Sequence, residues 1–198
     1  MKDLIALSGL AKTRVDAGFS RVGRRLSAAD PADRALMIMA ARAIAQANAV
    51  TALSERGLAN EALPILRELA EVCMTMRWVA EKDSTARAVG ALSELQDPDW
   101  ETHWPSARLR ERAEAYAVPG EALEAVLGSV VDFARGSAQG LPWGHVFADA
   151  TRPGRRAEEV LPTLAVYLGH ALKALDLRWP GEFPGAEELW TGAKISRG

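Results

Sequence analysis

The sequence has few of the residues that build disulfide frameworks, β-sheets or metal sites. Its single cysteine, Cys73, cannot form an internal disulfide, which suits a reducing cytoplasm. Only two tyrosines and four phenylalanines are present, and long β-branched runs are missing. The abundance of Ala, Leu, Arg and Glu favours helices over sheets. Because 198 residues can bury a sizeable core, we expect one all-α domain over residues 1–198.

Motifs of the common catalytic sites are missing as well. The three histidines, His103, His145 and His170, show no Glu-x-x-His or His-x-x-x-His spacing, so we expect no metal site and no cofactor. A phosphate-binding Gly-x-x-x-x-Gly-Lys-Ser/Thr loop does not occur, nor does a Gly-x-Ser-x-Gly nucleophile elbow. The sequence therefore predicts no particular reaction.

Apolar residues recur every three or four positions in the first third of the chain and predict three amphipathic helices. The first is expected at about residues 3–26. The second begins after Asp30, a good N-cap, with Pro31 in its first turn. Gly57 is expected to end the second helix and Asn60 to cap the third. The short link makes these two helices an antiparallel pair.

The rest of the chain continues the same architecture. Further helices are expected at about residues 83–96, 106–116, 119–135 and 155–177. Two irregular loops separate them, at 97–105 and 136–154. Residues 179–198 form a Pro- and Gly-containing tail, in which Trp179, Phe183 and Trp190 are expected to contact the bundle. The sequence thus predicts an all-α helical bundle with antiparallel core helices.

The first 28 residues are basic, with six basic and two acidic residues. A basic amphipathic helix can contact an anionic surface, so contact with nucleic acid stays open. We favour a packed helix with a solvated basic face over that alternative.

The most apolar stretch runs from Ala35 to Leu53 and contains Arg42, Gln46 and Asn48 near its middle. A central arginine costs about 2.5 kcal/mol or more in membrane insertion. We therefore expect a core helix, no membrane insertion and a cytoplasmic location.

The third expected helix carries a polar stripe beside its apolar face. At about 100° per residue, four side chains fall within about 60° of one another: Arg67, Glu71, Met74 and Trp78. Arg67 precedes Glu71 by four residues, the less favourable order for a purely local ion pair. We expect the pair to be partly buried, either as a polar network that fixes helix packing or as a ligand-facing arginine. Trp78 is a candidate ligand-binding residue.

The loop at 136–154 is the expected functional surface, because long loops in compact domains often carry function. It contains Trp143, His145 and Asp149. His145 is a candidate catalytic residue, since histidine has the side chain whose usual pKa lies nearest neutrality. Trp143 and Asp149 are candidate ligand-binding residues. In the alternative interpretation, Trp143 holds the loop on the bundle and His145 caps or bridges a helix end.

One run of residues has a recognisable pattern: Gly57-x3-Glu61-Ala62-x4-Arg67-x3-Glu71, followed by Trp78. It resembles the signature of a large bacterial family of uncharacterised helical proteins. The resemblance covers about residues 36–82, with His145 as a loose match to a later histidine. It implies a helical fold, a role in stress or phage defence and a remote likeness to HEPN domains. The Arg and His that HEPN nucleases place four to six residues apart are absent here.

Three functions follow from these observations. The first is a non-enzymatic binding or interaction protein, because every catalytic motif tested is missing. The second is a HEPN-like nuclease or hydrolase, which requires Arg67, Glu71 and His145 to share a cleft. The third is a structural helical homodimer that pairs through the N-terminal helix or the Trp-containing tail.

Overall fold

The computed structural model describes residues 2–96, 106–127 and 157–195. Within these ranges the chain forms helices and no strand, which confirms the all-α prediction. The helices are α1 (Lys2–Val22), the short 3-10 helix η1 (Gly23–Arg25), α2 (Pro31–Glu55), α3 (Leu63–Ala80), α4 (Ser84–Gln96), α5 (Ser106–Ala115), α8 (Ala157–Arg178) and α9 (Ala186–Ile195). Residues 120–127 are also helical.

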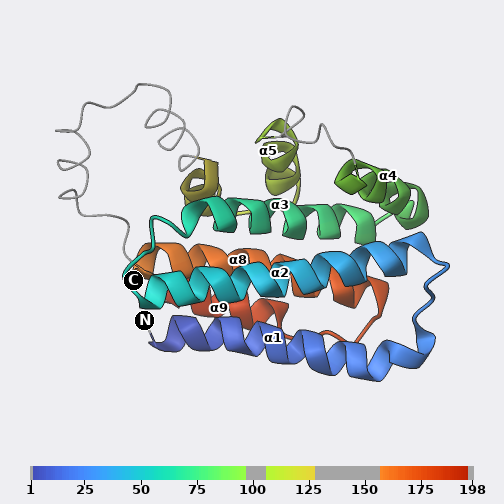
Figure 1. The fold of residues 1–198 in the computed structure, drawn as a ribbon, viewed down its shortest axis with the longest axis horizontal. Coiled ribbons are helices and arrows are strands. Elements are labelled where there is room, and N and C mark those ends of the chain that lie inside the picture. Colours follow the sequence, from blue (N-terminus) through green and yellow to red (C-terminus); the bar gives the residue numbers. More distant parts are fainter. Residues whose placement is uncertain (1, 97–105, 128–156, 196–198) are drawn as a thin grey trace.

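Helix α8 is the centre of the bundle. It packs against α1, α2, α3 and α9, and Figure 1 shows it running behind α2 with α3 and α1 on opposite sides. Every residue from Val160 to Leu172 is buried. A helix that is apolar on all faces is stable in water only when neighbours cover it on all sides. The neighbours of α8 therefore determine which of its few polar groups can reach a ligand.

Helices α2 and α8 are both long and apolar enough to cross a membrane, judged by length and composition alone. The core helix of a soluble protein passes the same test, and the apolar stretch of α8 is 83% buried in the bundle. The apolar stretch of α2 is 39% buried, and the absence of membrane insertion remains a prediction for both helices.

The start of α2 follows from its sequence as expected. The carboxylate of Asp30 accepts hydrogen bonds from the backbone N–H groups of Ala32 and Asp33, and Pro31 lies in the first turn. Arg178, at the end of α8, donates to Asp30 at 2.6 Å and to Asp33 at 2.8 Å. This ion-pair network ties the last turn of the central helix to the first turn of α2.

The prediction that Asn60 caps the third helix is wrong. Helix α3 begins at Leu63, its N-cap is Ala62, and no side chain makes the cap hydrogen bond. A turn over residues 59–62 precedes it, in which the N–H of Leu63 donates to the carbonyl of Asn60. Gly57 ends α2 as predicted, with a positive φ of 77° that favours glycine.

The C-terminal tail contains a helix, α9, that the sequence analysis does not predict. The tail packs on α1 through Phe19, whose ring centroid lies 6.0 Å from Trp179 and 5.1 Å from Phe183. Gly18 permits this contact, because a Cβ atom there would lie 2.2 Å from the Phe183 ring. Trp179 and Phe183 are buried, so they attach the tail to the bundle as expected.

The basic N-terminal helix is part of the bundle. Its buried face contacts α8, α2 and α9. Four of its basic side chains, counting the adjoining η1, have acidic partners: Lys12 with Asp16, Arg14 with Glu188, and both Arg21 and Arg25 with Glu182. These ion pairs neutralise much of the positive charge that left nucleic-acid contact open.

Candidate ligand-binding site

The predicted Arg67–Glu71 pair lies inside the bundle. The side chain of Arg67 is buried, at 5% exposure, and Glu71 is half-buried. Burial lowers the pKa of Arg67, and the charge of Glu71 opposes this shift. Burial raises the pKa of Glu71, while Arg67, Arg112 and Arg108 oppose the change. The two residues therefore belong to an ionic network that links α3 to α5.

Trp78 continues this network at the end of α3. The guanidinium carbon of Arg112 lies 4.5 Å from the centroid of its indole ring, and that of Arg87 lies 5.1 Å away. Arg87 donates to the backbone carbonyl of Trp78 at 2.6 Å, and Arg112 donates to the hydroxyl of Thr75 at 2.7 Å. The protein's own cations thus contact the ring that was a candidate for ligand binding.

The remaining sequence candidates, Trp143, His145 and Asp149, lie outside the described residues. Whether His145 meets Arg67 and Glu71 is therefore untested.

Cys73 is fully buried, as its apolar neighbours predict, and burial raises the pKa of its thiol. Within the described part of the chain, no group of three or more His, Cys, Asp or Glu side chains is placed to hold a metal ion.

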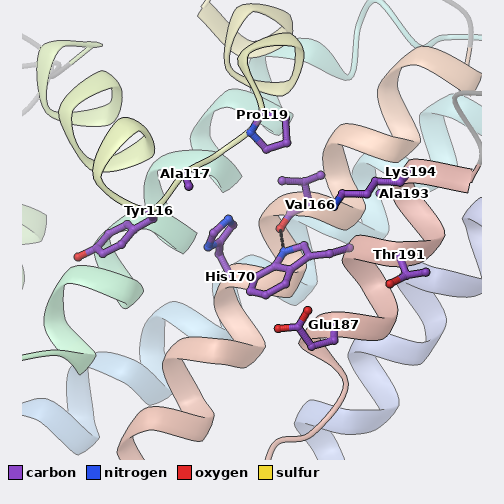
Figure 2. A pocket seen from close by; sticks show the side chains of 10 residues that line it. Tyr116, Ala117, Pro119, Val166, His170, Glu187, Thr191, Ala193 and Lys194 are labelled. Carbon is purple, nitrogen blue, oxygen red and sulfur yellow. Dashed lines mark hydrogen bonds between the residues drawn. The ribbon is translucent and has the colours of Figure 1, made fainter.

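A pocket of about 310 Å³ lies between α8, α9 and the segment that follows α5. Figure 2 shows the side chains arranged around it. The inner walls come from Tyr116, Ala117, Pro119, Val166, His170 and Trp190. Exposed side chains of α9 form the rim: Glu187, Thr191 and Lys194. The pocket is thus mostly apolar and aromatic inside and charged at its edge.

Trp190 holds α9 against α8 at this pocket. Its indole Nε1 donates to the carbonyl of Val166 at 3.1 Å, the dashed line in Figure 2. Its ring centroid lies 5.0 Å from that of His170, with the rings tilted by 54°. A Cβ atom on Gly169 would lie 2.3 Å from the same Nε1, so the indole can lie this close to α8 only because residue 169 is glycine.

His170 is the buried polar group of the pocket. Its side chain is 5% exposed, and its Nδ1 atom has no hydrogen-bond partner among the described residues. Burial, and to a smaller extent the charge of Arg77, lowers its pKa from 6.5 to about 4. The imidazole is therefore neutral at pH 7, with one nitrogen as donor and the other as acceptor.

A cation lies next to the inner wall. Arg77 of α3 is 13% exposed, and its guanidinium carbon is 4.9 Å from the centroid of the Tyr116 ring. Its Nη2 atom is 3.6 Å from Oε1 of Glu81, and the hydroxyl of Tyr116 donates to Oε2 of Glu81 at 3.4 Å. Arg77 Nε and Nη1 are buried and have no hydrogen-bond partner in the described ranges. The wall formed by Tyr116 and His170 thus has a buried, incompletely paired guanidinium beside it.

His170 is not among the site residues predicted from the sequence, because its spacing fits neither a helical metal site nor the Arg–His pattern of HEPN nucleases. A signal was available in the sequence. His170 is the one histidine of the stretch 157–178, and from Val160 to Leu172 the only other polar side chain besides the tyrosine hydroxyl is that of Thr163. An imidazole in the middle of such a helix must be buried whichever way the helix turns, and a buried polar group needs a partner.

The described fold is an all-α bundle with one buried histidine at a pocket between its C-terminal helices. Residues 33–117 match the model of a family of unknown function (DUF5677), which agrees with a resemblance to an uncharacterised family. No curated protein and no solved structure matched the chain. The matched range includes α3 but neither α8 nor α9. Of the residues that line the pocket, Tyr116 and Ala117 lie at the end of this range and the others lie outside it.

Proposed function

We propose that the protein is a helical binding protein that holds a small, flat, mostly apolar ligand in the pocket beside His170. One observation carries this proposal. The imidazole of His170 is 5% exposed, lines the pocket and has an Nδ1 atom without a partner among the described residues. A buried polar group left unpaired costs about 1–3 kcal/mol. Nδ1 is buried in the unliganded protein, so a ligand with one hydrogen-bonding group would recover that cost once the imidazole turns this nitrogen toward the pocket.

The walls support the flat and apolar part of the proposal. Aromatic rings of Tyr116 and Trp190 and the ring of Pro119 offer surfaces for stacking, while the neutral imidazole adds one polar group. The volume of about 310 Å³ is at the lower end of the range of ligand pockets, about 300–1,000 Å³. A bicyclic aromatic compound with one polar substituent is therefore the class of ligand to test.

The test uses naphthamide, a neutral compound with a flat body and one amide group. At about 0.3 kcal/mol per heavy atom, we expect a Kd of about 1 mM or below. Binding is followed in ¹H–¹⁵N spectra through the indole signal of Trp190, assigned with a Trp190→Phe variant.

His170→Phe keeps an aromatic ring but removes the hydrogen-bonding nitrogens, and we expect it to weaken binding about fivefold or more. Tyr167→Phe is the matched control, because Tyr167 is buried on the same helix but does not line the pocket. Binding that is unchanged in His170→Phe, or that leaves the Trp190 signal unmoved, would contradict the proposal.

The other functions stay proposals with less support. A HEPN-like nuclease or hydrolase requires His145 beside Arg67 and Glu71, and the network of Glu71 with Arg108 and Arg112 favours a structural role for this pair. A homodimer, a cytoplasmic location and a role in stress or phage defence rest on the sequence patterns and the resemblance. A binding function is compatible with each of the last three.

A further inference from the structure

We infer that the ligand of this pocket carries a carboxylate, oriented toward the wall formed by His170 and Tyr116, with Arg77 as the positive charge that attracts it. The inference rests on the proposed binding function and adds the charge of the ligand. Its basis is the arrangement of charged groups around the inner wall.

Arg77 is a buried cation whose charge is incompletely paired. Its side chain is 13% exposed, and two of its three guanidinium nitrogens lack a hydrogen-bond partner among the described residues. Its acidic partner in the described part of the chain is Glu81, whose Oε1 lies 3.6 Å from Nη2, longer than a charge-assisted hydrogen bond of about 2.7–2.9 Å. The guanidinium is therefore only partly compensated inside the protein.

Arg77 also lies next to the inner wall of the pocket. Two pocket-lining groups adjoin it, because its guanidinium lies over the ring of Tyr116 and its charge acts on the imidazole of His170. Arg87 is a second cation close enough to Tyr116 to act on its hydroxyl. Among the described residues, Glu81 is the one acid that acts on Tyr116 against the two cations, so the described charges behind this wall sum to a positive value.

The chemistry of the pocket then selects among ligands. A cation beside His170 would be repelled by Arg77, because both side chains are buried and solvent screens charges weakly there. A neutral ligand would gain the hydrogen bond to His170 but no charge attraction. A carboxylate would gain both, because it accepts a hydrogen bond from the donor tautomer of the imidazole and lies in the field of the guanidinium.

Three probes with the same flat body test this inference in the full-length protein: naphthoate, naphthamide and naphthylmethylamine, which are anionic, neutral and cationic at pH 7.5. We expect calorimetric titration at low salt to give a Kd for naphthoate about tenfold below that of naphthamide. The cation should bind about tenfold more weakly than naphthamide. Equal affinities for the three probes would overturn the inference but leave the proposed binding function intact.

Arg77→Gln is the decisive variant, and Arg110→Gln is its matched control. Arg110 is an exposed arginine of α5 that does not line the pocket, so its removal changes the net charge equally. We expect Arg77→Gln to remove the preference for naphthoate over naphthamide, and Arg110→Gln to keep it. A preference that survives in Arg77→Gln would contradict the role of Arg77.

Two further outcomes are also decisive. If circular dichroism shows that Arg77→Gln does not fold, the order of the three probes in the wild-type protein decides, because a cation that binds as well as the anion overturns the inference. If neither naphthoate nor naphthamide moves the Trp190 signal, the proposed function falls together with the inference.

Discussion

Acidification should destabilise the protein through His170. The folded protein holds this imidazole neutral, with its pKa lowered from 6.5 to about 4, whereas the unfolded chain protonates it at its ordinary pKa. Between these two values the unfolded state binds more protons than the folded state, so the free energy of unfolding must fall as the pH falls. The stabilisation is fully present above about pH 6.5 and is lost toward pH 4.

The size of the effect follows from the same difference. A shift from 6.5 to about 4, at about 1.4 kcal/mol per pH unit, corresponds to a loss of about 3.5 kcal/mol at most. Burial is the larger cause of the lowered pKa, and nearby charges add smaller changes. Arg77 of α3 disfavours the imidazolium, and Glu187 of α9 is the acidic residue at the rim of the pocket.

The assay is urea unfolding at several pH values between 4 and 8. His170→Phe removes the titrating group, so the difference in unfolding free energy between wild type and variant isolates its contribution from groups that titrate in both, such as Asp30 and Glu71. We expect this difference to change by about 2–3 kcal/mol across the window, and Tyr167→Phe to follow the wild type. A difference that is independent of pH would refute the burial of a neutral imidazole.

Three further predictions test the framework of the site. Gly169→Ala should push the Trp190 indole away from α8, lower the free energy of unfolding by about 1–3 kcal/mol and abolish naphthamide binding. Gly9→Ala is the control: its Cβ meets open space in α1, so it should raise the free energy of unfolding by about 0.5–1 kcal/mol in the same denaturant assay. Arg67→Met and Glu71→Gln should each lower the free energy of unfolding by about 2–4 kcal/mol, and the double variant should lose less than the sum of the two. Additive losses below about 0.5 kcal/mol in this double-mutant cycle would indicate a surface pair. Deleting residues 1–28 should expose the face of α8 that α1 covers, and the resulting aggregation should be visible in size-exclusion chromatography. A truncated monomer with an unchanged unfolding midpoint would argue against that packing.

Features that depend on local chemistry could be predicted from the sequence. The start of α2 at Asp30 and Pro31 follows from capping rules, and its end follows from the glycine at position 57. The burial of Arg67 could be predicted because an arginine next to an apolar helix face needs an internal partner.

Features that depend on tertiary contacts could not be predicted. Helix α9 is amphipathic but has only ten residues, and its neighbourhood is rich in Gly and Pro. A helix this short is marginal on its own, and packing of Trp190 on α8 stabilises it. Asn60 has the residue type of an N-cap, but the turn at 59–62 places Ala62 at that position. The pocket brings together Tyr116, His170 and Trp190 from three separate segments, and no spacing in the sequence relates them.

A crystal structure of the protein with naphthamide tests the central claim most directly. We expect the naphthalene rings between Trp190 and Pro119, with the imidazole of His170 turned so that its Nδ1 lies within hydrogen-bond distance of the amide group. Naphthamide at another surface, with the pocket beside His170 left without it, would contradict the claim.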